Sequence, residues 1–369
     1  MPDPRSLPPR PEPVPGAAAP SPIWPRVEEL IDGAPGLQAL RAHRIQLLAG
    51  RRWRELGREI PEDLRSEEHL AAIRDAIAPD LLARVRAATE QPVVLLKGPE
   101  IARRYPAPAL RHYIDLDLLA PDAEQLQAEL LAAGFERTED PAWAFRREGD
   151  GDLFADKHHC HPLRWAGWPM RLEIHRRPSW PAWLPQPPVP EFFDLARPAD
   201  ADGFLTLPPA PHVLVLAAHL WVTNPFARLR DVLDIALLLP EADPDEVEAL
   251  ATAWGAGRMW ATTQAVVCSV LLGGPTSSAD RLWARHLAAA REQTVIEVHV
   301  TRWASPFWAL PLRRALPVAA SSAASDFRPA VGEPWRSKAK RSLRTLGNLG
   351  TPKSRHEGQL GREGRQLRR

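Results

Sequence analysis

Three short segments constrain the fold of this chain more than any other feature. They read V-V-L-L-K-G at 93–98, I-D-L-D-L-L at 114–119 and M-R-L-E-I-H at 170–175. The first is a continuous apolar run closed by Lys97-Gly98, typical of a buried strand that turns sharply into a helix. The other two alternate apolar and polar residues, the pattern of strands buried on one face. Helical segments precede and follow them, so the sequence predicts an α/β (α+β) protein with a small mixed sheet flanked by helices.

The two alternating segments carry three carboxylates in positions that suit a metal site. On a strand Asp115 and Asp117 point to one face, and Glu173 shares a face with His175 on another strand. Two carboxylates at i and i+2 project in parallel, and a third from a neighbouring strand can complete a set of ligands. Mg²⁺, or Mn²⁺ in its place, prefers such oxygen ligands. We therefore predict that Asp115, Asp117 and Glu173 are the catalytic and metal-binding residues; Asp152 and Asp156 are alternatives for the third carboxylate.

Three further residues are candidates for contact with phosphate groups. Gly98 lets backbone amides at a helix start approach phosphate oxygens without a Cβ in the way. Lys97 adds a positive charge at the same turn. Arg111 lies in the loop that leads into the acidic strand, and contact with a phosphate or with an aspartate is the functional interpretation for it. The other interpretation is a strand-capping Lys97 and an exposed Arg111.

The remaining chain divides into regions by composition and periodicity. Residues 1–25 are rich in proline and predict a disordered leader, and apolar residues at helical spacing predict helices in the segment that follows. We expect Pro79 to break the last of these runs into two helices. The predicted regions are a leader at 1–25, an N-terminal helical segment at 26–91, a catalytic core at 92–200, a helical domain at 201–316, and a linker with a basic tail, largely disordered, at 317–369.

Several finer elements are also predicted. A further strand is expected at 142–147, and the Pro- and Trp-rich residues 178–211 are expected to form an ordered but irregular connection. Residues 334–346 have the pattern of a basic amphipathic helix.

Net charge is +1 over 369 residues, but it is unevenly distributed. The segment 336–369 contains eleven Lys/Arg and two Asp/Glu, so it carries +9 and the preceding residues sum to −8. We therefore expect a polyanion, if one is bound, to contact the tail. Two cysteines do not make a disulfide framework, and the sequence shows neither a secretion signal in its first thirty residues nor a long apolar span. A cytoplasmic protein without a membrane span is the expectation.

The residues described so far resemble an uncharacterised bacterial nucleotidyltransferase-like family, within the polymerase-beta-type superfamily. The resemblance rests on V-L-L-K-G, the R-x-x-x-D-x-D-L-L strand, a helix ending in A-G-F, the later E-I-H strand, and the stretch from His219 through Arg228 to D-I-A at 234–236. It covers roughly residues 37–239. The superfamily usually has Gly-Ser at the turn, where this chain has Lys97-Gly98.

The resemblance implies roles for individual residues and an activity. Gly98 matches the phosphate-loop glycine, Asp115 and Asp117 match the metal carboxylates, and Glu173 matches the third carboxylate. The implied function is metal-dependent transfer of an NMP from an NTP to a hydroxyl or other acceptor, which could be a small molecule, a peptide or RNA. Two alternatives remain: a degenerate protein that binds a nucleotide or a partner without turnover, and an RNA-modifying toxin-like enzyme.

Two other polar clusters have plainer interpretations. One cluster could be interpreted as a zinc site: His158, His159, Cys160 and His161. Because neighbours on a strand alternate faces, only two of the four could point at one ion, so we interpret the run as a polar strand beside the cleft. His175 is either a hydrogen-bonded strand residue or a support for Glu173.

The polar residues of the segment 228–234 have helical spacings that favour structural ion pairs among themselves. The functional interpretation is that Arg228, together with His219, lines the cleft.

Overall fold

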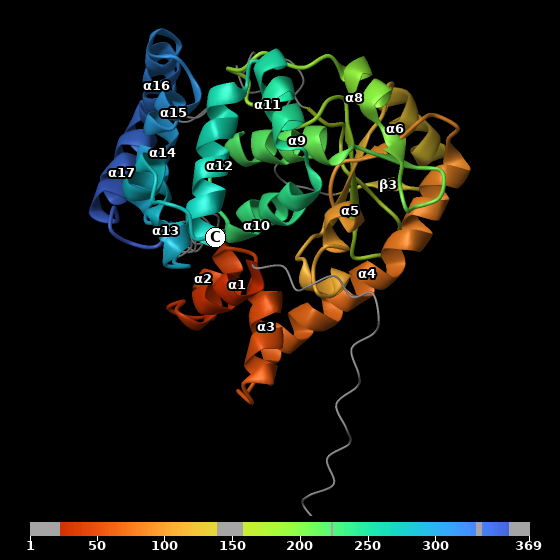
Figure 1. Ribbon diagram of the computed structural model, residues 1–369, viewed down its shortest axis with the longest axis horizontal. Helices are drawn as coiled ribbons and strands as arrows, with labels where there is room; N and C mark the ends of the chain where they lie inside the picture. Colours follow the sequence, from red (N-terminus) through yellow and green to blue (C-terminus); the bar gives the residue numbers. More distant parts are fainter. Residues whose placement is uncertain (1–22, 139–157, 223, 330–333, 354–369) are drawn as a thin grey trace, which may run out of the picture.

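The computed structural model describes residues 23–138, 158–222, 224–329 and 334–353. The described chain forms an open seven-stranded mixed sheet with helices around it (Figure 1). The strand order is β3-β4-β5-β2-β1-β7-β6. The strands are short, and their bounds are β1 Val94–Leu95, β2 Asp115–Leu119, β3 Glu136–Arg137, β4 Leu163–Arg164, β5 Arg171–His175, β6 Arg197–Pro198 and β7 Leu205–Thr206. The predicted fold class is confirmed, and the three diagnostic segments supply β1, β2 and β5.

The central pair of strands, β2 and β5, runs parallel in full register. Asp117 lies opposite Glu173, and Leu119 lies opposite His175. Side chains on paired strands at the same register point to the same face, so the acidic residues of both strands gather on one side. The apolar residues that alternate with them, such as Leu118 and Ile174, are fully buried on the other side.

Different helices cover the two faces of the sheet. The apolar face packs against the C-terminal half of α4 (Glu62–Ala88) and against α6 (Ala123–Ala132) in one buried cluster. Asp122 starts α6 by accepting a hydrogen bond from the Gln125 amide at 2.9 Å. The neighbouring strand β1 alternates between the two cores: Leu95 packs in this cluster, and Val94 packs in the helical core on the opposite side. The acidic face of the sheet is therefore turned towards the helices that follow in the chain.

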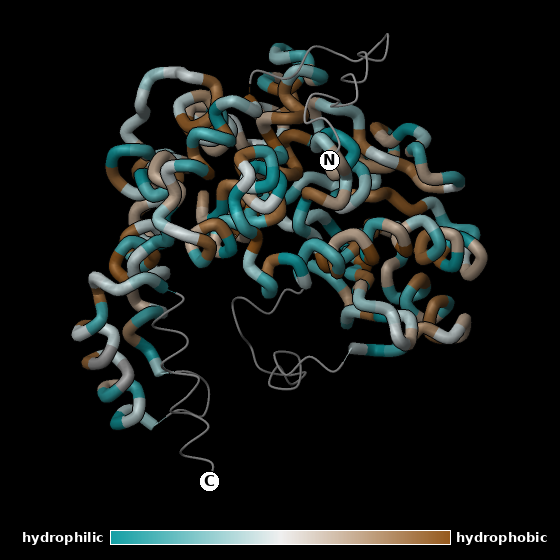
Figure 2. Tube along the Cα trace, turned by 90° about the horizontal axis from the view of Figure 1, so that it is seen from below, coloured by the Kyte–Doolittle hydropathy of each residue, from teal (hydrophilic) through white to brown (hydrophobic). Residues whose placement is uncertain are grey.

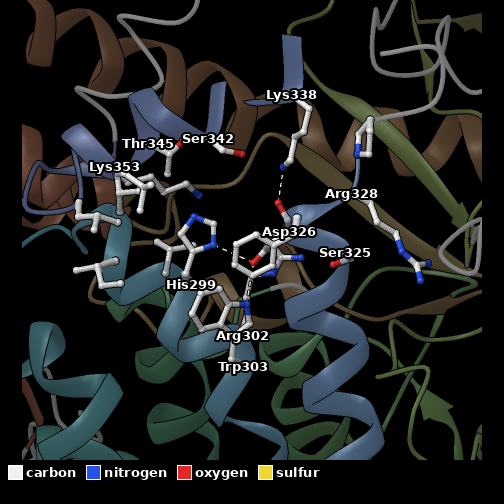
Figure 3. A pocket seen from close by; sticks show the side chains of 17 residues that line it. His299, Arg302, Trp303, Ser325, Asp326, Arg328, Lys338, Ser342, Thr345 and Lys353 are labelled. Carbon is white, nitrogen blue, oxygen red and sulfur yellow. Dashed lines mark hydrogen bonds and ion pairs between the residues drawn. The ribbon is translucent and has the colours of Figure 1, made fainter. Parts of the chain in front are cut away.

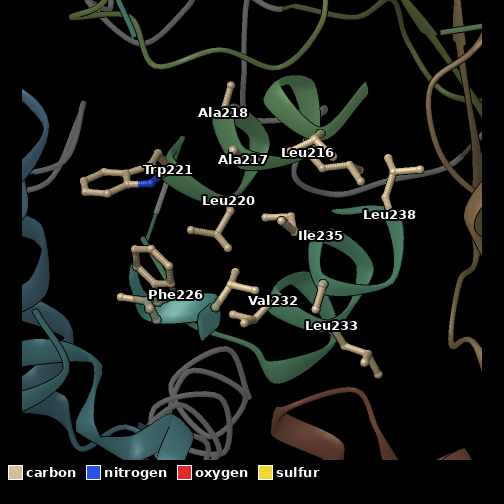
Figure 4. Close-up of a cluster of buried hydrophobic side chains, with 14 of the residues drawn as sticks. Leu216, Ala217, Ala218, Leu220, Trp221, Phe226, Val232, Leu233, Ile235 and Leu238 are labelled. Atoms are coloured by element: carbon tan, nitrogen blue, oxygen red, sulfur yellow. The ribbon is translucent and has the colours of Figure 1, made fainter. Parts of the chain in front are cut away.

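The helical core beyond the acidic face is formed mainly by α9, α10, α11 and α12. Trp221 of α9, Phe226 in the loop before α10, and Val232 of α10 are buried in this core (Figure 4). The Trp221 and Phe226 rings lie edge to face with their centroids 5.5 Å apart. Burying a side chain of this size stabilises the fold by roughly 1.5–3 kcal/mol. The bounds are α9 Pro209–Trp221, α10 Leu229–Leu238, η2 Leu239–Glu241, α11 Pro244–Ala253 and α12 Gly257–Leu271, followed by the π-helical turn η3 Asp280–Ala284 and α13 Arg285–Ala288.

The N-terminal helices lie under this helical core (Figure 1). They are α1 Ile23–Asp32, α2 Leu37–Ala42 and α3 Gln46–Glu55, and α4 follows them. Ile23 is buried at the first turn of α1, so the helical segment begins before the predicted end of the leader at residue 25. Residues 1–22 of that leader lie outside the described residues. The prediction that Pro79 splits the last run is wrong, because α4 continues through it.

The connection at 178–211 is more regular than predicted. It contains α8 (Val189–Leu195) and the antiparallel pair β6–β7, and β7 pairs in parallel with β1. The two strands have two residues each, so no alternation is long enough to predict them from the sequence. The strand predicted at 142–147 lies outside the described residues.

The C-terminal helices form one end of the molecule, beyond α12 (Figures 1 and 2). They are α14 Val295–Ala304, α15 Pro306–Ala309, α16 Leu312–Phe327 and α17 Trp335–Gly347. The basic helix predicted at 334–346 is confirmed as α17. The linker predicted from residue 317 is wrong up to Phe327, because α16 covers it and packs against α14 and α15. The part of the tail at 354–369 lies outside the described residues. In the described ranges, no helix combines the length and the apolar character needed to cross a membrane.

Candidate active site

The site is built on the acidic face of β2 and β5. Asp117, Glu173 and His175 each offer a ligand atom, and these atoms lie within 4.8 Å of one another. The Nε2 atom of His175 is 2.9 Å from Oδ1 of Asp117, and both side chains are almost completely buried. The structure therefore brings together two of the three predicted carboxylates and adds an imidazole.

Lys97 reaches the same carboxylate from the end of β1. The antiparallel pairing of β1 with β2 includes a hydrogen bond from the Leu96 amide to the Asp117 carbonyl at 3.0 Å, so the next side chain lies beside Asp117. The Lys97 ammonium is 3.0 Å from Oδ1 of Asp117 and 3.4 Å from both ring nitrogens of His219 on α9. A positive charge thus touches the predicted metal-binding carboxylate directly.

The pKa values of the two carboxylates in the cluster are shifted in opposite directions. Burial favours the neutral form of Asp117, but the Lys97 ammonium and the hydrogen bond from His175 outweigh it and hold the pKa of Asp117 well below its usual range. Burial, reinforced by the neighbouring charges of Asp115 and Asp117, raises the pKa of Glu173 to about 7. At neutral pH, Asp117 is fully ionised while Glu173 can give or take a proton.

Asp115 occupies a more open position on the same face. It is partly exposed and lies opposite Arg171 in the β2–β5 register. The cluster of atoms that could hold an ion includes Asp117, Glu173 and His175 but not Asp115. Asp115 is close enough to influence the pKa of Glu173, so it borders the cluster at its open side.

The predicted turn at Gly98 is present. Gly98 has φ 75°, in the region that favours glycine, and it precedes the short helix α5 (Pro99–Ala102). A Cβ at this position would lie 3.3 Å from the Leu116 side chain, so the turn is also close to β2. Backbone geometry alone therefore accounts for a glycine here, and contact with a phosphate stays a prediction.

Of the two partners predicted for Arg111, a phosphate or an aspartate, the structure shows an aspartate, and the alternative of an exposed Arg111 is wrong. Its guanidinium makes a two-point ion pair with Asp234 of α10, at 3.0 Å from Nε to Oδ1 and 2.7 Å from Nη2 to Oδ2. The Tyr105 hydroxyl donates to the same carboxylate at 2.8 Å. Both members of the pair are 3% exposed. Arg111, which follows the short 3₁₀ turn η1 (Pro108–Leu110), therefore joins the strand layer to the helical core.

The ion pairs predicted within the segment 228–234 are found only in part, because one forms between chain neighbours and Asp234 pairs outside the segment. Asp234 pairs across the chain with Arg111, and Arg230 pairs with its neighbour Asp231 at 2.5 Å. Helical spacing permits local pairs, but burial between two layers selects the partners that are available there.

The histidine-rich run lies beside β5 through a single β-bridge and does not form the predicted strand. Cys160 is buried in the sheet core, while His159 forms a bridge with His175 and lies 3.9 Å, from Nε2 to Oε2, from Glu173. The His158 ring lies 5.3 Å, between centroids, from the His175 ring. In the described chain these four residues do not form a ligand cluster of their own. Asp152 and Asp156, the alternatives to Glu173, lie outside the described residues.

The described residues form two cavities of interest, of which the first adjoins the site. One has a volume of about 440 Å³ and includes His158 and His219 in its wall, so it adjoins the carboxylate cluster. The other, of about 540 Å³, lies between α14, α16 and α17 (Figure 3). At its base the Asp326 carboxylate is held by His299, Arg302 and Trp303 at 2.7–2.9 Å. Apart from Lys353, which lines both cavities, the second is formed by other residues.

Comparison with known proteins agrees with this geometry. A family model described as "uncharacterised nucleotidyltransferase" matches residues 33–271, which is well over half of the chain. The chain belongs to this nucleotidyltransferase family. The matched region spans the sheet, the acidic face and the helices through α12. No match was found among curated proteins or among solved structures.

His175 was predicted either to support Glu173 or to be a hydrogen-bonded strand residue. The actual partner is Asp117. The alternation of β5 already places His175 on the acidic face, but its neighbour depends on the register between β2 and β5, which no local pattern specifies. His219, which was considered as a residue lining the cleft, lies in the wall of the adjoining cavity and beside Lys97.

Proposed function

We propose that the protein is a divalent-metal-dependent nucleotidyltransferase that transfers an NMP from an NTP to a hydroxyl or other acceptor. The observation that carries the proposal is the register of Asp117 against Glu173, with His175 beside them, in a chain of a nucleotidyltransferase family. In the reaction, the acceptor oxygen forms a bond to the α-phosphorus. The bond from that phosphorus to the leaving pyrophosphate breaks, and the acceptor proton passes to a base or to water.

The residues present suit a divalent ion. Carboxylate oxygens are the ligands that Mg²⁺ and Mn²⁺ prefer, and an imidazole nitrogen is compatible with Mn²⁺. Asp117 and Glu173 would hold the ion, with Asp115 at the open side of the cluster. The ion would neutralise charge on the phosphates as it develops. Lys97 would contact phosphate oxygens, and Glu173, as a ligand of the ion, would help to activate the acceptor.

The direct test is transfer of label from α-labelled NTPs in lysate, with Mg²⁺ or Mn²⁺ supplied. We expect the wild-type protein to label an acceptor, and Asp117→Asn to reduce the rate at least about 100-fold because it removes a metal ligand. Asp80→Asn, an exposed change on α4, is the matched control and should label normally. Equal labelling by the wild type and by an Asp115→Asn/Asp117→Asn protein of unchanged melting temperature would remove the assignment. Identifying the labelled species would name the acceptor.

A protein that binds nucleotide without turnover is the second candidate. The contact between Lys97 and Asp117 favours it, because the ammonium group supplies a positive charge where a metal-dependent enzyme uses an ion. Calorimetry separates the two functions. NTP binding that is insensitive to Mg²⁺ and to loss of both aspartates supports the second candidate, whereas metal-dependent binding supports the enzyme.

Helix α17 is the proposed contact for a polyanion such as RNA. Its sequence W-R-S-K-A-K-R-S-L-R-T-L-G has no acidic residue, and Arg336 and Lys340 are exposed. Electrostatic binding of this kind weakens steeply with salt. Arg336→Glu/Lys340→Glu should weaken RNA binding and reduce its salt dependence, and unchanged binding would count against the contact. If the acceptor is a cellular RNA and the enzyme acts as a toxin, growth arrest on expression must disappear with Asp115→Asn/Asp117→Asn.

A further inference from the structure

The cavity of about 440 Å³ beside the carboxylate cluster has the size of a small-molecule site. Its wall combines the end of α9, the start of α10 and the loop after α2, and it includes His219. His219 is 3.4 Å from the Lys97 ammonium, which in turn is 3.0 Å from Asp117. A ligand in this cavity would therefore lie next to the predicted reaction centre.

Two polar groups in the cavity wall have unmet hydrogen-bonding capacity. The Ser179 hydroxyl, on a residue only 4% exposed, has no hydrogen-bond partner in the described chain, and the same holds for Oδ1 of Asn224. The Asn224 amide nitrogen donates to Gln293 at 2.7 Å, which orients its oxygen as an acceptor. Buried polar groups are usually satisfied, so a molecule in the cavity that carries donors and acceptors could bond to both. Ribose hydroxyls and base edges have both.

Arg228 is a cation of the same wall without an ion-pair partner. It directly precedes α10, is partly exposed, and makes no side-chain hydrogen bond or ion pair in the described residues. Its neighbour Arg230 differs, because it binds Asp231 and the His112 carbonyl. Asp231 of the same wall is within electrostatic range of Arg228. Because the two side chains make no direct ion pair, the guanidinium can still bind a phosphate group.

Arg44 is a second cation of this kind, and its backbone is strained. It follows His43 of the cavity wall, makes no side-chain hydrogen bond or ion pair in the described chain, and has φ 57°. A non-glycine residue in this region costs roughly 1 kcal/mol or more. The loop is fixed because His43 accepts hydrogen bonds from the backbone amides of Arg230 and Leu229, each at 3.2 Å.

The charges around Arg44 indicate where it lies. Burial, together with Arg230 and Arg228, lowers the pKa of Arg44 to about 10, and Asp231 and Asp115 act in the opposite direction. Arg44 is therefore within electrostatic range both of the cavity wall and of Asp115 on β2. The guanidinium groups of Arg44 and Arg228 would both attract an anion with several charges. Such an anion could extend from the cavity to the acidic face, where a metal ion would bind.

We propose that this cavity is the nucleotide site of the transfer reaction, in which Arg44 and Arg228 bind the triphosphate while Ser179 and Asn224 contact the ribose or base. This inference rests on the proposed function. It assigns triphosphate recognition to arginines from the N-terminal segment and from α10, in addition to the turn at Gly98. In this proposal, the strained backbone at Arg44 serves to place its side chain where it can bind the triphosphate.

The test is calorimetric binding of each NTP and of the matching unphosphorylated nucleoside to the full chain with Mg²⁺. Arg44→Gly and Arg228→Ala should each weaken NTP binding at least about 10-fold and change nucleoside binding less than about 2-fold. Arg228→Lys should restore only part of the loss, because lysine cannot bind phosphate at two points. Arg51→Ala, an exposed arginine of α3, is the control. Asn224→Ala should weaken binding of NTP and nucleoside equally.

Arg44→Gly also separates function from folding. Glycine relieves the positive φ, so the melting temperature should stay the same or rise while NTP affinity falls. NTP affinity that is unchanged in both arginine variants would overturn the inference and leave the proposed transferase intact. Equal losses for NTP and nucleoside would also overturn it, since that pattern indicates a structural role. A wild-type protein that binds no NTP would contradict the proposed function itself.

Discussion

At the scale of single residues, burial decides which groups are charged. Three histidines away from the acidic face, His43, His212 and His286, are at most 1% exposed. Each is bound through Nε2 to a backbone carbonyl: the Arg291 carbonyl at 2.8 Å, the Leu96 carbonyl at 2.6 Å and the Phe226 carbonyl at 3.0 Å, respectively. Burial is the main cause that lowers their pKa values, to about 4 for the first two and about 3 for His286. These side chains are neutral in the folded protein at pH 5 and charged in the unfolded chain.

We therefore predict that the protein loses stability in mild acid. The unfolded histidines, with a pKa of about 6.5, take up protons that the folded ones do not, so the free energy of unfolding falls as pH drops from about 7 to about 4. It stops falling, for these groups, once the folded histidines are protonated. Each contributes up to about 1.4 kcal/mol per pH unit. Urea unfolding of wild type and His286→Gln at pH 7 and pH 5 measures this, and an equal pH dependence in both proteins would contradict it.

At the scale of elements, the long helix α4 shows how packing overrides a local signal. Pro79 removes one helical hydrogen bond and predicts a break, yet the helix runs from Glu62 to Ala88. Leu64 and Ala71 are buried before the proline, and Leu81, Leu82 and Val85 are buried after it. Because both halves are anchored along one line, the chain gains more from continuing the helix than it loses at one exposed proline.

Pro79→Ala should therefore stabilise the protein. Alanine restores the missing amide and removes the steric conflict. The free energy of unfolding should rise by about 1–3 kcal/mol, which is at most the full cost of a proline inside a helix. Thermal unfolding gives the result, and Pro79→Gly, which restores the amide with poor helix propensity, should gain less. A lower melting temperature for Pro79→Ala would mean that the fold needs a bend at this position.

At the scale of the whole molecule, one buried ion pair joins the sheet to the helical core. Arg111 precedes β2, Asp234 belongs to α10, and Tyr105 completes the arrangement. The aromatic and aliphatic core of α9, α10 and α12 lies behind it. The acidic face of β2 belongs to the sheet, and part of the wall of the proposed nucleotide cavity belongs to the helical core. The ion pair therefore fixes the distance between the acidic face and the cavity wall.

Removing one member of this pair should destabilise the protein strongly. Asp234→Ala leaves Arg111 buried without a partner, and the expected loss is about 3–5 kcal/mol. Arg111→Met/Asp234→Leu should recover most of it, because no buried charge remains. The control is Arg104→Ala, which breaks the more exposed ion pair with Glu241 and should cost less than about 1 kcal/mol. Similar losses for both single variants in urea unfolding would contradict the distinction.

The sequence alone determined β1, β2 and β5, the faces of β2 and β5 and the acidic residues on them, because alternation over five or six residues and a Lys-Gly turn are local properties. It also indicated the family, the main helices and the basic helix α17. It did not reveal β6 and β7, which are too short to carry a pattern, or the continuity of α4 and α16, which depends on packing.

Only the tertiary structure decided which polar groups meet. The β2–β5 register brought Glu173 and His175 to Asp117 and left Asp115 at the edge. The packing of α10 against the strand layer decided which of the two predicted partners Arg111 contacts, a carboxylate and not a phosphate. Arg44 and Arg228, 184 positions apart in the numbering of the chain, came within electrostatic range of each other. Spacing along a strand specifies the direction of a side chain, but its partner depends on contacts between distant segments, which no local pattern contains.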